Sequence, residues 1–436
     1  MRTFRQILFW AHLGAGLVAG LSIGIMCFTG AALAFEQELV AWSERDVRRV
    51  APPAPDAPRL PLEELQRRVR EAKPDARPTG ITVSADPRAA VAFTFGRDHA
   101  LYADPYTGEV RAPAAPNRVH DFMHVMEDWH RVLALGGDRR PLGKAINGAC
   151  NLAFLGLAVT GLYLWWPRSL SWRSVRAVAV LNWRLAGKAR DFNWHNAIGL
   201  WSAPILIVLT ITAVPISYRW GGNLIFKLTG ETPPAAGQQG PAALAAPPVE
   251  VPQPAPGTRP VGYDMLLATV QQQAPRWETI SFRLGGFGGR GAGRPAGGAA
   301  AGQSNPAAAA PDTAAAGERR PRGHSTPGGR SALTAITLTV KEPGAWPRTA
   351  TTTYSLNPFT AEVLKTEAFA DLSVARQIRS WTRFLHTGQA LGWVGQLVAG
   401  LACLGGCVLV YTGFALAWRR FFGRKNGETE AVRTPV

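Results

Sequence analysis

The stretch NWHNAIGLW, residues 193–201, opens an uncharged and mostly apolar run that continues to Tyr218. A run of this length can cross a lipid bilayer as a helix, which puts one ionisable side chain, His195, at the edge of a membrane span. An ionisable residue at such a depth is costly and usually functional. Histidines recur in comparable positions along the chain, and they organise our interpretation of its fold.

Membrane crossing is predicted four times, by windows that contain no Asp, Glu, Lys or Arg. These windows are 6–35, 145–167, 192–218 and 384–418. Each exceeds the roughly 20 residues needed to cross the bilayer core. We therefore expect transmembrane helices at about 7–34, 145–166, 195–218 and 392–418. A secretory signal is the alternative for the first, because Ala32-Leu33-Ala34 resembles a cleavage site, but the apolar run is far longer than that of a usual signal.

Basic residues predict the orientation of these helices. Lys and Arg are concentrated in the loop 168–191 and the tail 419–436. Short basic flanks stay in the cytoplasm. We therefore expect a bacterial inner-membrane protein with both termini cytoplasmic and two long periplasmic loops, 36–140 and 219–385. The net charge of +17 largely reflects this topology and an arginine-containing insert, so we predict membrane lipid and no nucleic acid as a partner.

The two outer segments repeat one order of elements: a proline-rich stretch, a helical pattern, strand-like runs and a turn. In segment 36–140 these lie at 52–61, 62–72, 80–102 and 104–110. In segment 219–385 they lie at 233–258, 263–273, 279–354 and 357–363. A Gly-, Ala- and Pro-rich insert, residues 285–331, interrupts the second set and is too poor in large apolar side chains to form a core. We predict two small α+β modules and an internal duplication.

The predicted membrane helices repeat as well. The matched positions are His12, Gly16 and Thr29 against His195, Gly199 and Thr212, and His130, Thr160 and Gly161 against His386, Thr412 and Gly413. The expected fold is a mainly α membrane protein, a four-transmembrane-helix bundle with pseudo-two-fold duplication and two periplasmic α+β modules. Its expected divisions are helices at 1–35, 141–167, 192–218 and 386–418, modules at 36–140 and 219–385, a cytoplasmic loop at 168–191 and a tail at 419–436.

Topology assigns four histidines to two levels. His12 and His195 should lie near the cytoplasmic face, and His130 and His386 near the outer face. A two-fold axis along the membrane normal would make each pair face across the bundle. Two imidazoles from facing helices can provide both axial ligands of a haem iron, so we predict two haem b groups. Each ring would need its second nitrogen held by a group that the sequence does not identify.

Other interpretations stay open at this stage. A lone histidine at a helix end is commonly a hydrogen-bonded structural residue, and a duplication would preserve even that. A zinc or copper site needs three or four clustered ligands, and a proton relay would lack an acid inside the helices. On the outer side, His120 and His124 share a helical face. We keep His124 as the reserve for His130, and it could also touch substrate.

Three motifs carry a family resemblance: WHRVL at 129–133, TGLYLWWPR at 160–168 and WHNAIGLW at 194–201. With the Asp/Asn-Pro-aromatic-Thr turns at 104–107 and 357–360, they resemble the PepSY-associated transmembrane family, also described as iron-regulated membrane proteins. The resemblance covers nearly all of the chain except the inserts, and it implies two periplasmic PepSY modules. It further implies similarity to members that are b-haem ferric-siderophore reductases, which pass electrons outward and release iron as Fe(II). The insert interrupts the second module, so substrate contacts cannot be carried onto it.

The predicted function is an inner-membrane di-haem oxidoreductase that reduces periplasmic ferric siderophores or other ferric chelates for iron acquisition. Basic outer residues that could attract an anionic chelate are Arg118, Arg131, Arg139, Arg140, Arg379 and Arg383. Gly-rich 285–302 lacks the strand-then-helix context of a dinucleotide site, so the electron donor is a membrane quinol or a separate cytoplasmic reductase. The alternatives are a non-enzymatic PepSY sensor or regulator that binds a periplasmic partner, and a metal-ion transporter.

Overall fold

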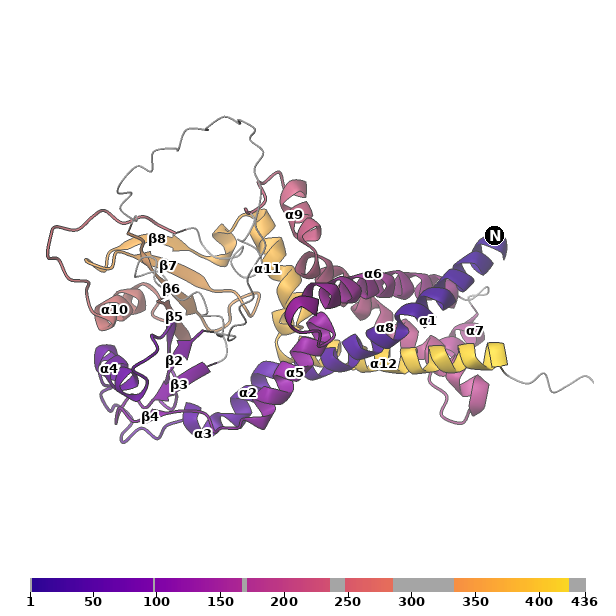
Figure 1. Ribbon diagram of the computed structural model, residues 1–436, viewed down its shortest axis with the longest axis horizontal. Coiled ribbons are helices and arrows are strands. Elements are labelled where there is room, and N and C mark those ends of the chain that lie inside the picture. The colour runs from indigo at the N-terminus through magenta and orange to yellow at the C-terminus, as the bar shows by residue number, and fades with distance from the viewer. Residues whose placement is uncertain (1, 97–98, 167–170, 236–247, 285–332, 423–436) are drawn as a thin grey trace, which may run out of the picture.

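The computed structural model describes residues 2–96, 99–166, 171–235, 248–284 and 333–422. It contains a bundle of long helices and, at one end of the bundle, an antiparallel sheet with its covering helices (Figure 1). The predicted insert at 285–331 lies outside the described residues, as does nearly all of the predicted tail.

Within these described residues, four helices are long and apolar enough to cross a membrane, as predicted. They are α1 (Arg2–Leu33), α6 (Arg140–Trp165), α8 (Gly187–Ser217) and α12 (Trp393–Phe422). α1 packs against α6 and α12, and α8 packs against the same two helices. α1 and α8 therefore lie on opposite sides of the bundle, which is the arrangement required for His12 and His195 to face each other.

α8 begins earlier than its apolar window indicates. Asp191 is fully buried in its first turns and forms ion pairs with Arg190 at 2.9 Å and with Arg419 of α12 at 3.0 Å. These pairs compensate the burial of the carboxylate and join the charged start of α8 to the end of α12. His195 consequently lies eight residues from the start of α8, about 12 Å along its axis, rather than at its edge. Asp191 also corrects the expectation that no acid lies inside these helices.

The outer histidines lie on two separate helices, α5 (Arg118–Val132) and α11 (Val374–His386), which precede α6 and α12. Residues with positive φ, Leu133 at 53° and Gly388 at 73°, end the two helices and redirect the chain. A Cβ at Gly388 would lie 2.7 Å from the backbone nitrogen of Gln396, so the second turn requires glycine. After these turns, α5 packs against α1 and α6, and α11 packs against α8.

Strands from both outer segments form one eight-stranded antiparallel sheet. Its order is β4-β3-β2-β1-β5-β6-β7-β8. The strands are β1 (Gly80–Ser84), β2 (Val91–Phe95), β3 (His99–Ala103), β4 (Val110–Arg111), β5 (Thr279–Arg283), β6 (Ile336–Lys341), β7 (Thr352–Leu356) and β8 (Val363–Glu367). The two expected modules are thus joined along β1 and β5, with Ile81 opposite Phe282. Joining them pairs two strand edges that would otherwise be open.

Helices α4 (Leu62–Ala72) and α10 (Tyr263–Gln273) cover the sheet, and both segments contribute to one core that includes Leu65, Phe93, Val270 and Ile280. The two helices cap each other. The carboxylate of Asp264 accepts from the backbone N–H of Leu62 at 3.0–3.1 Å, and that of Glu63 accepts from the N–H of Asp264 at 3.3 Å. The N-terminal N–H groups of each helix are thus satisfied by the other segment.

Four shorter helices connect these parts. They are α2 (Glu36–Ser43), α3 (Arg45–Arg48), α7 (Trp172–Ala179) and α9 (Arg219–Leu228). Figure 1 shows α2, α3 and α5 on the path between α1 and the sheet, whereas α7 lies at the other end of the bundle.

Candidate functional site

Each of the four predicted histidines has its Nδ1 atom in a hydrogen bond to an oxygen of its own half of the chain. His12 Nδ1 lies 2.8 Å from Thr160 Oγ1, and His195 Nδ1 lies 2.9 Å from Thr412 Oγ1. His130 Nδ1 lies 2.9 Å from Thr29 Oγ1. The partner of each of these three rings is therefore a threonine on a neighbouring helix.

His386 differs in its partner. Its Nδ1 lies 2.9 Å from the backbone carbonyl oxygen of Leu209, although the repeat would place Thr212 there. The Thr212 hydroxyl bonds the carbonyls of Val208 and Leu209 instead, at 2.6 and 3.0 Å.

The partners determine which ring nitrogen carries the proton. The hydroxyl protons of Thr29, Thr160 and Thr412 are directed to the carbonyl four residues earlier in their own helix, at 2.7 to 2.8 Å. A hydroxyl has a single proton to donate, so its oxygen accepts from the histidine N–H. The Leu209 carbonyl is an acceptor only. All four rings are therefore held as Nδ1–H tautomers, and Nε2 keeps its lone pair.

The outer pair has the separation of two ligands on one metal ion. The ring centres of His130 and His386 are 6.2 Å apart, with an interplanar angle of 50°. Two imidazoles bound through Nε2 on opposite sides of one ion, at about 2 Å each, would have ring centres roughly 6 Å apart. Burial, and secondarily the charge of His386, lowers the pKa of His130 to about 4, and burial also lowers the pKa of His386. Burial thus favours the neutral form of both rings, which is the form that ligation requires.

Glycines that follow the partner threonines leave room for three of the rings. A Cβ on Gly30 would lie 3.3 Å from His130 Cε1, one on Gly161 would lie 3.4 Å from His12 Cε1, and one on Gly413 would lie 3.6 Å from His195 Cε1. The missing side chain is needed for close packing of the ring at Gly30, whereas a Cβ at Gly161 or Gly413 would make an ordinary van der Waals contact.

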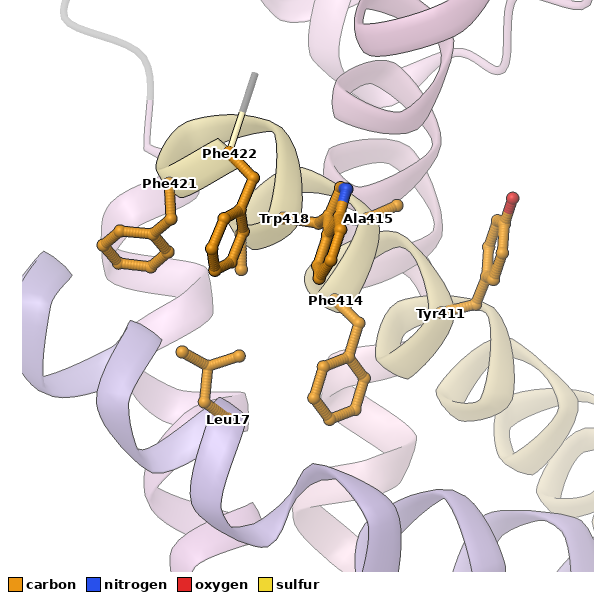
Figure 2. Close-up of a pocket in the computed structure, with 8 residues that line it drawn as sticks. Leu17, Tyr411, Phe414, Ala415, Trp418, Phe421 and Phe422 are labelled. Atoms are coloured by element: carbon orange, nitrogen blue, oxygen red, sulfur yellow. The ribbon is translucent and has the colours of Figure 1, made fainter. Parts of the chain in front are cut away.

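An open apolar groove with a volume of about 470 Å³ lies between α1 and α12 beside the inner level, and its large lining side chains are exposed. Figure 2 shows Leu17 of α1 facing a group of aromatic side chains of α12, among them Phe414, Trp418 and Phe422, while Tyr411 points away. Phe414 follows Gly413, which lies against the His195 ring. The hollow can accept a large apolar group near the inner histidines.

The structure brings His130 rather than the reserve His124 opposite His386. His124 instead pairs with His120 on the same helix, with 3.2 Å between their Nε2 atoms. Within the described ranges, no group of three or more His, Cys, Asp or Glu side chains forms a metal cluster. The assignment of the four histidines to two ligand pairs stays a prediction. The threonine partners were not recognised from the sequence, although Thr29, Thr160 and Thr412 stood in its repeated motifs.

No curated protein matches the chain. The model of one family, the PepSY-associated TM region, matches residues 9–420 and thus spans the bundle and the sheet. The chain therefore belongs to the PepSY-associated transmembrane family.

Proposed function

We propose that the protein is a di-haem b oxidoreductase that passes electrons across the inner membrane and reduces ferric chelates, such as ferric siderophores, on the periplasmic side. The observation that carries the proposal is the set of four Nδ1–H imidazoles, each with its Nε2 lone pair left for an iron ion. Metal-bound histidines almost always donate their second N–H to a fixed acceptor, which orients the ring.

The residues present fit two haems. His12 with His195 and His130 with His386 would bind the two iron ions, and the open apolar groove beside Leu17 provides space near the inner pair. When bound, haem b supplies a one-electron acceptor and donor at each level. The protein holds the rings in one tautomer and surrounds them with apolar helices. Two such levels along one bundle form a route for electrons across the membrane.

The orientation follows from charge. Helix α7, which belongs to the basic loop, and the end of α12 with Arg419 and Arg420 lie at the end of the bundle away from the sheet. We infer that this end is cytoplasmic and that the sheet is periplasmic. The matching element order of the two outer segments supports two PepSY modules that arose by duplication, related by a pseudo-two-fold axis through the β1–β5 pair.

Three arginines are the best candidates to attract an anionic ferric chelate. Of the six predicted from the sequence, Arg131 and Arg140 form ion pairs with Glu127 and Asp128, and Arg379 donates to the carbonyl of Pro215. The other three, Arg118, Arg139 and Arg383, are exposed. Their charge would raise the local concentration of an anionic substrate. Electrons would come from a membrane quinol or a separate reductase.

Haem content of single and double variants tests the pairing. We expect two b-type haems per chain in wild-type protein purified in detergent from cells with adequate haem supply. His12→Ala, His195→Ala and their double variant should each lose the same single equivalent, because both residues bind one iron. His195→Ala with His130→Ala should lose both, and His99→Ala, an exposed position on β3, should lose none.

Substrate reduction is tested on the same material. The chemically reduced protein should return to its oxidised spectrum when a ferric chelate is added, with Fe(II) trapped by a colorimetric ferrous chelator. Absence of haem from wild-type protein would overturn the proposal and favour the sensor or regulator interpretation. Additive losses from His12→Ala and His195→Ala would overturn the pairing alone.

A further inference from the structure

A second pair of histidines lies on α5, outside the two proposed haem levels. His120 and His124 are four residues apart on one helical face, and their Nε2 atoms are 3.2 Å apart. Their ring centres are 4.3 Å apart, with an interplanar angle of 69°. One ring donates a proton to the other, so both Nε2 atoms already point toward a common place.

This separation is the one that a metal ion imposes on two imidazoles. Nitrogens bound at about 2.1 Å to one ion lie roughly 3.0 Å apart at a right angle and roughly 3.4 Å apart at the tetrahedral angle. The observed 3.2 Å lies between these limits. Replacing the shared proton with a metal ion would therefore require little movement of either ring.

The backbone under the pair is fixed on both sides. Asn117 caps α5, with its side-chain oxygen accepting from the backbone N–H of His120 at 3.2 Å. Met123 and Met126 of the same helix are buried and anchor it to the bundle. The two histidines are thus presented from an anchored first turn, which lowers the entropic cost of binding an ion between them.

Nearby charge favours a cation. The carboxylates of Glu36 and Glu127 interact electrostatically with each other, and Glu36 also interacts with the His124 ring. Glu127 is partly neutralised by its ion pair with Arg131. A bound cation would relieve the repulsion that remains between the two carboxylates.

We propose that His120 and His124 form a bidentate site for a divalent first-row transition-metal ion. Imidazole nitrogen suits such ions, and it does not suit Mg²⁺ or Ca²⁺, which prefer oxygen. Within the described part of the chain no third His, Cys, Asp or Glu joins the pair, so the remaining positions belong to water or to a chelate that the ion brings with it. Such a site is open and exchanges its ion readily.

The site lies beyond the outer histidine level on the side of the sheet. His124 and His120 precede His130 by six and ten residues, about 9 and 15 Å along the axis of α5. An ion released near the outer level could be bound here before it leaves. The metal site itself does not depend on haem or on the proposed reaction.

Calorimetric titration of the haem-loaded full-length protein in detergent with Zn²⁺ tests the proposal. Wild type should bind Zn²⁺ at one site. In His120→Ala and His124→Ala this site should be absent or its affinity for Zn²⁺ lowered at least about tenfold, because removing a ligand weakens metal binding no less than removing a group that orients a ligand. His99→Ala is the matched control and should bind as wild type. Alanine favours helix, so neither variant should unfold α5.

Nitrogen counting by Cu²⁺ EPR gives a second measurement. Hyperfine structure from two imidazoles is expected in wild type and from one in His124→Ala. Equal Zn²⁺ affinity in wild type and both variants, or an unchanged nitrogen count, would overturn the site. Failure of the metal site is distinguishable from failure of the proposed function. If the haem pairing is correct, His120→Ala and His124→Ala keep both haems whether or not they bind Zn²⁺. If the protein contains no haem, it would still bind Zn²⁺ at His120 and His124.

Discussion

Thr412→Val is the sharpest test of how the bundle prepares its histidines. Thr412 is fully buried, and its hydroxyl oxygen is the acceptor for His195 Nδ1–H. Valine replaces the hydroxyl with a methyl group of similar size, so the packing is nearly kept while the N–H loses its partner. A buried donor left without a partner costs about 1–3 kcal/mol.

Two estimates of the effect agree. Loss of the group that orients a metal-bound histidine lowers metal affinity about 10–100-fold, which corresponds to about 1.4–2.8 kcal/mol. Haem titration of the apoprotein, followed by the growth of the b-type absorbance band, should therefore show one of two sites weakened by this factor. Thr412→Ser keeps the hydroxyl and should bind both haems with nearly wild-type affinity.

A matched control lies on α8. Thr210 is also buried and donates to the Leu206 carbonyl, but no histidine contacts its hydroxyl. Thr210→Val should leave both affinities unchanged. If Thr412→Val and Thr210→Val weaken binding equally, or if neither does, the hydroxyl is not the orienting group and the tautomer assignment is wrong.

Three further predictions concern other parts of the structure. Gly30→Ala should reduce occupancy of the outer haem, because its Cβ would lie 3.3 Å from His130 Cε1. Gly136→Ala should not, because no atom lies within 4 Å of its Cβ. Pyridine haemochrome quantification of haem content distinguishes the two variants. Thr212→Val should keep both haems despite its place in the repeat, because its hydroxyl bonds only its own helix, and a loss of haem would contradict the observed partner. Burial, and then its hydrogen bond with Glu63, raises the pKa of Asp264 to about 6, while burial acts against the hydrogen bonds that hold the pKa of Glu63 below its usual value. The folded state binds the Asp264 proton more tightly than the unfolded chain, so this contribution to stability is lost as the pH rises through about 6. The melting temperature of wild type should therefore fall relative to that of Asp264→Asn between pH 5 and 7. A constant difference between the two melting temperatures would refute the raised pKa of Asp264.

The sequence predicted the four membrane helices that the described residues contain, because charge-free windows are local signals. The two histidine levels, which rest on repeated spacings, stay a prediction. The predicted start of α8 was too late. A carboxylate in the sequence indicates an exposed residue outside the membrane helix unless the partners that allow its burial are known. Asp191 is tolerated inside the helix only because Arg190 and Arg419 compensate it, and Arg419 lies more than 200 residues away in the sequence.

The joining of the two outer segments also escaped prediction. Strands β1 and β5 are short, and their amino-acid composition does not indicate that Ile81 lies opposite Phe282. Register between distant strands is determined by the common core, which is a property of the assembled fold. The partners of the ring nitrogens were missed for the same reason: the spacing of Thr160 and Thr412 was visible, but a bond between helices depends on their crossing.

The sheet order has a mechanical consequence for the outer histidines. The two edge strands, β4 and β8, are the ones that lead into α5 and α11. Eight strands at about 4.8 Å spacing separate these edges by roughly 34 Å, yet the helices converge until the two imidazoles are 6.2 Å apart. The sheet and the two helices thus form a triangle with the histidines near its apex and the sheet as its base. A ligand that changes the twist of the sheet would rotate both α5 and α11. Strain applied far from the membrane would thus change the geometry of the His130 and His386 rings.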